Sequence, residues 1–168
     1  MTDDILEVEH LTREFSVRGE TVTAVDDVSF TVHRGEALGL VGESGSGKST
    51  TARCVLRLIE PTRGTVRMNG VDITTLRRRA LKDFRARAQM VFQDPYSSLD
   101  PRMRVREIIA EGIRIHRPRA KDSVVTDEIV ELLEVVGLRP DHLDRLPAAF
   151  SGGERQRIGI ARALAVNP

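Results

Sequence analysis

Several features that often define a class of function are scarce or missing in this sequence. Its 168 residues include one cysteine, Cys54, so an internal disulfide and a metal site built from several cysteines are both excluded. No apolar run approaches the ~20 residues that a membrane-spanning helix requires. Lysine plus arginine (26) nearly balance aspartate plus glutamate (25), so the net charge of +1 gives no electrostatic argument for nucleic acid or an anionic membrane. Any association with a membrane is therefore expected to depend on a partner.

The composition is that of an ordinary globular protein. Apolar residues make up 40% of the chain and charged residues 30%, far from the profile of a disordered chain. The length suits one domain with a buried core. The acidic start lacks the basic and apolar regions of a signal peptide, and together with the lone cysteine this fits a reducing cytosol.

Alternation and turn residues predict strands in the first half of the chain. Residues 22–32 alternate as a half-buried strand does, with Val28, Phe30 and Val32 on one face. An Asn-Gly pair within residues 65–73 predicts a hairpin, so we expect a small antiparallel layer. Two short apolar runs, 37–41 and 88–92, are expected to form buried strands.

Helical spacing dominates the second half. Residues 122–136 place apolar side chains at helical intervals before Gly137, which is a suitable C-cap, and we expect Cys54 to be a core position of an earlier helix. On the last helix, Ile158, Ala161, Leu164 and Ala165 are expected to line one face. The predicted helices cover residues 48–59, 77–87, 105–115, 122–136 and 151–165.

A glycine-rich loop between an apolar run and a helix carries the strongest chemical signal. It matches the pattern G-x-x-x-x-G-K-[ST], in which backbone N–H groups and a helix N-terminus surround phosphate oxygens. Lys48 is expected to reach the β- and γ-phosphates, and Ser49 to hold Mg²⁺. The alternative is an incidental Gly/Ser turn; the context favours binding of ATP or GTP. The loop residues are Gly42, Glu43, Ser44, Gly45, Ser46, Gly47, Lys48, Ser49 and Thr50.

Three further segments narrow the choice among phosphate-binding families. Phe15 precedes the loop, Gln93 follows it, and Phe-Ser-Gly-Gly-Glu-Arg-Gln occupies residues 150–156. This ordered set resembles the nucleotide-binding domain of ABC ATPases. The resemblance implies an α/β fold: a P-loop NTPase core of the ABC type with an antiparallel β layer and a helical subdomain.

The resemblance assigns roles to the first two of these residues. Phe15 would stack on adenine, because a ring face offers stacking without base-edge hydrogen bonds; core packing is the alternative. Gln93 would contact Mg²⁺ and the attacking water, which makes it a catalytic candidate together with Lys48. Otherwise it is a solvated turn residue.

The third segment is also a helix start. Ser-x-x-Glu is a capping box, so the simplest explanation is a helix N-cap. In the family this signature contacts the γ-phosphate held by a second ATPase subunit, in a head-to-tail dimer that encloses two ATP molecules. The family residue at the fifth position is usually glutamine, so Glu154 is a departure. The residues expected to act in trans are Ser151, Gly152, Gly153 and Glu154.

Residues 93–103 resemble a narrower branch, the ATPase subunits of oligopeptide, dipeptide and nickel importers. This implies an ATP-binding, energy-coupling subunit whose hydrolysis of ATP drives import. Its partners would be integral membrane permease subunits and, indirectly, a solute-binding protein, with the subunit peripheral on the cytoplasmic side of the plasma membrane. The alternatives are a catalytically impaired nucleotide-binding fragment and a soluble ABC ATPase that acts on DNA or ribosomes.

Other candidate sites are weaker. The basic stretch at 77–87 lacks interleaved aromatic residues and is interrupted by Asp83, which favours a solvated helix face over a nucleic-acid partner. The four histidines have no metal-ligand spacing, so Mg²⁺ arriving with ATP is the one metal expected.

The family pattern continues beyond a segment like 161–168 with a strand ending in Asp-Glu, a further loop and a switch histidine. We therefore expect one nucleotide-binding domain, incomplete at its C-terminus, with a core and β layer over about 1–93, a helical subdomain over about 94–150 and a signature helix over about 151–165. Hydrolysis by this chain alone is expected to be weak, since positioned acid and base groups contribute ~10²–10⁴-fold. Its folding is expected to be marginal, because the next strand would be central in the sheet.

Overall fold

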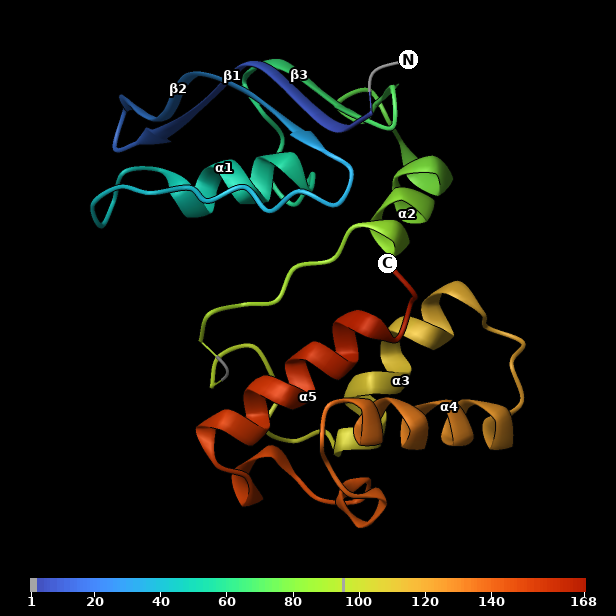
Figure 1. The fold of residues 1–168 in the computed structure, drawn as a ribbon. Helices are drawn as coiled ribbons and strands as arrows, with labels where there is room; N and C mark the ends of the chain where they lie inside the picture. The colour runs from blue at the N-terminus through green and yellow to red at the C-terminus, as the bar shows by residue number, and fades with distance from the viewer. Residues whose placement is uncertain (1–2, 95) are drawn as a thin grey trace. The chain divides into compact units, whose positions relative to one another are not determined.

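The computed structural model describes residues 3–94 and 96–168. The chain divides into two compact units, residues 1–82 and residues 83–168. The first unit contains an antiparallel sheet in the order β2-β1-β3-β4. One helix, α1 (Lys48–Val55), packs on the β1–β2 hairpin and lies along one face of the sheet (Figure 1). The strands are β1 (Asp4–Val17), β2 (Glu20–His33), β3 (Arg63–Met68) and β4 (Val71–Asp72).

Two sequence predictions for the sheet are confirmed. On β2, Val28, Phe30 and Val32 are half-buried and alternate with exposed residues, as a strand with one covered face requires. Asn69 and Gly70 form the turn between β3 and β4, with φ values of 48° and 75°. Positive φ at both central residues is what a two-residue hairpin turn of type I′ needs.

Strand β1 lacks the regular alternation that predicts a strand from sequence. Val8 and Leu11 are both buried although they are three residues apart. The pairing register of β1 with β2 shifts between them, and His10 adopts a φ of 52°. A bulge of this kind inserts an extra residue, so the apolar face changes phase.

The predictions of buried strands at 37–41 and 88–92 are wrong. Neither segment forms a strand. Leu38 and Leu40 are each 44% exposed, Val41 97% and Val91 43%. A strand needs a hydrogen-bonded neighbour, and among the described residues no strand pairs with either segment. Apolar composition alone does not supply that partner.

Helix α1 begins at Lys48 as predicted but ends at Val55, before the expected residue 59. Cys54 is completely buried, which confirms it as a core position. The buried Arg57 follows with a φ of 51°, and its Nε donates to the carbonyl oxygen of Ile73 at 3.0 Å. The core of the first unit consists of Val8, Leu11, Val25, Cys54, Val55, Val66 and Ile73.

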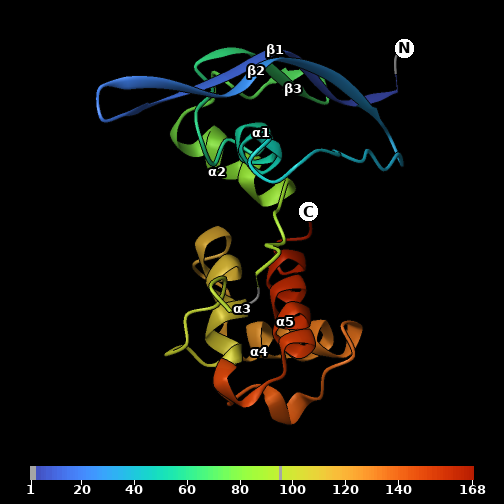
Figure 2. The ribbon, with the colours of Figure 1, turned by 90° about the vertical axis from the view of Figure 1, so that its left-hand side faces the viewer.

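Helix α2 (Arg78–Arg87) forms where the basic stretch predicted a helix. The second unit is built from three longer helices that pack on one another (Figure 2). These are α3 (Val105–His116), α4 (Asp122–Val135) and α5 (Gly152–Leu164). Two short 3₁₀ helices, η1 (Pro140–His142) and η2 (Pro147–Ala149), lie between α4 and α5.

The ends and faces of these helices follow the sequence closely. Gly137 terminates α4 with a φ of 71°, and the Leu138 N–H donates to the carbonyl oxygen of Leu133 at 2.8 Å, as in a Schellman motif. On α5, Ile158 and Ala161 are fully buried, whereas Leu164 is 37% exposed, so its prediction as a core-facing residue is wrong. In the part of the chain that the structure describes, every helix is too short or too polar to cross a bilayer.

Candidate functional site

The glycine-rich loop leads directly into α1. Gly47 is the N-cap of the helix and has no side chain to satisfy the first N–H groups. Gly45 and Gly47 adopt φ values of 85° and 86°, the left-handed conformation that glycine tolerates. The loop therefore curls back on itself before the helix begins.

Gly47 also fixes the loop against the sheet. A Cβ atom on Gly47 would lie 2.1 Å from the carbonyl oxygen of Ala24 on β2, far inside van der Waals contact. Only a residue without a side chain allows this approach. The glycine thus sets the distance between the loop and the β1–β2 hairpin.

The ammonium group of Lys48 folds across the loop. Its Nζ donates to the carbonyl oxygens of Gly42 at 2.7 Å and Glu43 at 2.5 Å, and to Ser46 Oγ at 3.1 Å. These acceptors use all three ammonium donors. A side chain at Gly42 would crowd this space, because its Cβ would lie 2.7 Å from Ser46 Oγ and 3.9 Å from Lys48 Nζ.

The backbone around the ammonium is rich in free donors. Among the described residues, none accepts a hydrogen bond from the N–H groups of Gly45, Gly47, Lys48 or Ser49. Free N–H groups at a helix N-terminus, next to a cation, attract anions. The residues present therefore fit a phosphate group, and Ser49, exposed on the first turn of α1, offers a hydroxyl for its metal ion.

Phe15 belongs to the same unit as this loop. It lies near the end of β1 opposite Val22 of β2 and is half-buried. The guanidinium of Arg13 lies over its ring, with 4.4 Å between Cζ and the ring centroid. Arg13 carries no motif of its own, but residues two apart on a strand share a face, and that spacing links it to Phe15.

Gln93 belongs to the second unit and lies in an exposed bend rather than at a strand end. The segment around it is held by α5: Gln156 Nε2 donates to the carbonyl oxygen of Phe92 at 3.4 Å, and Arg162 Nη1 to that of Ser98 at 2.6 Å. Burial lowers the pKa of Arg162, against the opposing effect of Glu111.

The predicted capping box is present at the start of α5. Ser151 Oγ accepts from the Glu154 N–H at 3.3 Å, while Glu154 Oε2 accepts from the Ser151 N–H at 2.9 Å and from its hydroxyl at 2.8 Å. These hydrogen bonds lower the pKa of Glu154. Gly152 and Gly153 form the first turn. The helix N-terminus is thus well defined and open to solvent at Gly153.

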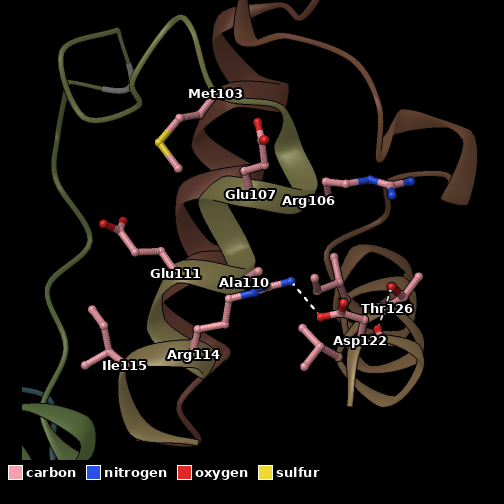
Figure 3. Close-up of a pocket in the computed structure, with 11 residues that line it drawn as sticks. Met103, Arg106, Glu107, Ala110, Glu111, Arg114, Ile115, Asp122 and Thr126 are labelled. Carbon is pink, nitrogen blue, oxygen red and sulfur yellow. Dashed lines mark hydrogen bonds and ion pairs between the residues drawn. The ribbon is translucent and has the colours of Figure 1, made fainter. Parts of the chain in front are cut away.

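A separate groove of about 670 Å³ lies between α3 and α4 (Figure 3). An ion pair between Arg114 and Asp122 crosses it at 3.0 Å. It shares no residue with the glycine-rich loop or with residues 151–154. Groups of three or more His, Cys, Asp or Glu able to hold a metal ion do not occur within residues 3–94 and 96–168.

The chain belongs to the ABC transporter family, whose model matches residues 25–168. Its relatives include the oligopeptide transport ATP-binding protein OppF of Bacillus subtilis, 53% identical over 100% of this chain and 55% of the relative. OppF of Streptococcus mutans is 47% identical over 98% of the chain and 54% of the relative. A probable peptide ABC transporter ATP-binding protein of Sinorhizobium fredii, y4tS, is 48% identical over 100% and 49%. The chain therefore spans about half the length of these relatives.

Solved structures agree with this family. A dimeric ATP-binding cassette, MJ0796, bound to ADP and phosphate, superposes with a TM-score of 0.86 at 28% identity, over 97% of this chain and 70% of that one. The fold of cbiO1 from Clostridium perfringens gives a TM-score of 0.78 at 23% identity, over 99% and 63%. The resemblance and the fold class predicted from the sequence, an α/β ABC-type cassette, are confirmed.

Proposed function

We propose that this chain is the ATP-binding, energy-coupling part of an ABC importer for peptides. One observation carries the proposal: an ammonium group and unpaired backbone N–H groups surround the same glycine-rich turn at the start of α1. Such a site suits the triphosphate of ATP. The names of the relatives, which concern oligopeptide and peptide transport, support peptides rather than nickel as the cargo.

Each residue of the loop has a distinct task in this proposal. Lys48 exchanges its carbonyl acceptors for oxygens of the β- and γ-phosphates, and the free N–H groups bind the remaining oxygens. Ser49 and Gln93 are the residues that would hold Mg²⁺, and Gln93 would also orient the attacking water. The ion, when bound, neutralises charge on the phosphates. The ring of Phe15 would stack on the base of the nucleotide.

The capping box serves a neighbouring subunit. Its glycines leave the first turn of α5 open at Gly153, so the helix N-terminus is suited to a phosphate held by a second ATPase subunit. Dimeric cassettes among the similar structures support a pair of ATPase subunits, which in this proposal pack head to tail. Permease subunits and a solute-binding protein would complete the importer, with this chain on the cytoplasmic side of the membrane.

Titration of the chain with ATP tests the proposal. Lys48→Ala removes the ammonium and should weaken ATP binding about 10- to 100-fold, because hydrogen bonds to charged groups contribute about 1.5–3 kcal/mol. Lys82→Ala removes an exposed lysine from α2 and should leave binding unchanged. Equal ATP affinity in wild type and a folded Lys48→Ala variant would rule the proposal out.

Transport needs its own test. In cells that depend on this importer for peptide uptake, Lys48→Ala should abolish growth on peptides, whereas Lys82→Ala should support it. Parallel assays of ATP binding and hydrolysis separate a working ATPase from a chain that only binds nucleotide. Growth on peptides with the Lys48→Ala variant would show that another protein energises uptake.

A further inference from the structure

One face of the Phe15 ring is covered by a cation from its own strand. Arg13 and Phe15 lie on the same face of β1, and 4.4 Å separates Arg13 Cζ from the ring centroid. A guanidinium within ~6 Å of a ring centroid makes a cation–π interaction. The ring is half-buried, and Arg13 occupies one of its two faces.

The guanidinium is not free to move away from the ring. Its Nη1 donates to the carbonyl oxygen of Glu60 at 2.8 Å, which ties β1 to the segment after α1. Its Nε is buried and has no hydrogen-bond partner among the described residues. Packing, rather than a full set of polar contacts, therefore holds Arg13 in place.

This pair lies on the hairpin that contacts the glycine-rich loop. Arg13 pairs with Val25 of β2, and the neighbouring residue Ala24 presents the carbonyl oxygen against which Gly47 packs. The glycine-rich loop and the Phe15 ring are thus both fixed to the β1–β2 hairpin. Movement of one relative to the other would disturb both contacts.

We propose that Arg13 is a positioning residue for the nucleotide base, an inference that rests on the proposed function of the loop. It holds the Phe15 ring in one orientation, so that the uncovered face stacks on the base. A ring fixed in advance loses less freedom when the base binds. Because stacking reads no base edges, Arg13 supports adenine and guanine alike.

The test compares a nucleotide with a ligand that has no base. Arg13→Gln should weaken binding of both ATP and GTP about two- to fivefold, the size expected of a cation–π interaction of about 0.5–1 kcal/mol. Binding of inorganic tripolyphosphate should not change. Arg63→Gln is the matched control, since Arg63 is exposed on β3 and pairs with Glu14 rather than with the ring. A loss of affinity confined to the nucleotides supports the inference.

A double-mutant cycle separates positioning from general stability. Phe15→Leu should weaken ATP binding, and Arg13→Gln added to it should have no further effect. An equal loss of tripolyphosphate binding in Arg13→Gln would show a general effect on the glycine-rich loop and would overturn the inference. Independent effects of the two positions, or unchanged ATP affinity, would overturn the inference. Lys48→Ala provides the separate check: if it leaves tripolyphosphate binding intact, the proposed function fails instead.

Discussion

The guanidinium of Arg155 lies over the ring of Tyr96, with 4.3 Å between Cζ and the ring centroid. Arg155 directly follows the capping box on α5, and Tyr96 lies three residues after Gln93. Arg155 Nε also donates to the carbonyl oxygen of Pro147 at 2.8 Å, which fixes the guanidinium. The segment that contains Gln93, which we propose to act on Mg²⁺, is therefore attached to α5. The N-terminus of α5 is the part proposed to serve the neighbouring subunit.

This contact can be followed in solution, because Tyr96 is the one tyrosine of the chain and there is no tryptophan. Arg155→Gln should remove the cover from the ring, so acrylamide should quench tyrosine fluorescence more strongly. The loss of stability should be about 1–3 kcal/mol, because the substitution also removes the hydrogen bond from Arg155 to the Pro147 carbonyl oxygen. Arg119→Gln, at an exposed arginine in the connection between α3 and α4, should change neither value. Unaltered quenching in Arg155→Gln would show that the stacked pair does not persist.

Gly47→Ala should be among the most damaging single substitutions in the first unit. The left-handed backbone costs about 1–2 kcal/mol for an L-residue, and overpacking against Ala24 adds about 1–3 kcal/mol. Gly19→Ala is the matched control, since Gly19 has a φ of 87° and nothing within 4 Å of its Cβ position. Denaturant unfolding of the two variants should differ by the cost of the clash. Equal losses would mean that the loop can retreat from β2.

The sequence predicted those parts of the fold that depend on neighbours in the chain. The capping box at Ser151, the glycine after α4 and the Asn69-Gly70 turn each involve residues within a few positions of one another, and all three are present. The strands predicted at 37–41 and 88–92 failed because a strand depends on a distant partner. Strand β1 shows the opposite case. The bulge near His10 breaks the alternation of its sequence, but its pairing with a neighbouring strand tolerates that break.

The same distinction applies to the candidate site. A local pattern predicted a phosphate-binding loop at 42–50, and in the structure the Lys48 ammonium donates to carbonyl oxygens of that loop. The partner of Tyr96, in contrast, is 59 positions away, at Arg155, and no spacing in the sequence links the two. The packing of Gly47 on Ala24 could not be predicted either, because these two residues are also far apart in the sequence. Long-range contacts of this kind require the folded chain.

Acid should weaken the start of α5 through Glu154. Hydrogen bonds from the Ser151 N–H and hydroxyl lower the pKa of this carboxyl from its ordinary value of 4.5. Its contribution to stability is thus complete above that value and is lost as the pH falls through the lowered pKa. Glu154→Gln keeps the capping box but cannot ionise. The unfolding midpoint of the variant should therefore fall less than that of the wild type between about pH 7 and about pH 3; equal falls would contradict the prediction.

Cys54 offers a probe of whether ligand binding stabilises α1. The thiol is fully buried, and burial raises its pKa from the ordinary value of 9.0, with Arg13 acting in the opposite direction. Both effects of burial, exclusion of reagent and loss of thiolate, protect the sulfur in the folded protein. The raised pKa also means that stability is complete below 9.0 and declines as the pH rises from there towards the folded value.

A thiol reagent at neutral pH should therefore label Cys54 only when the helix opens, and no other cysteine contributes to the signal. ATP and tripolyphosphate should slow labelling, because a ligand bound at Lys48 on the first turn of the same helix stabilises the closed form by an amount set by its concentration relative to Kd. Lys48→Ala should remove this protection, while Lys82→Ala should retain it. Fast labelling of the wild type at saturating ATP would show that nucleotide binding does not reach α1.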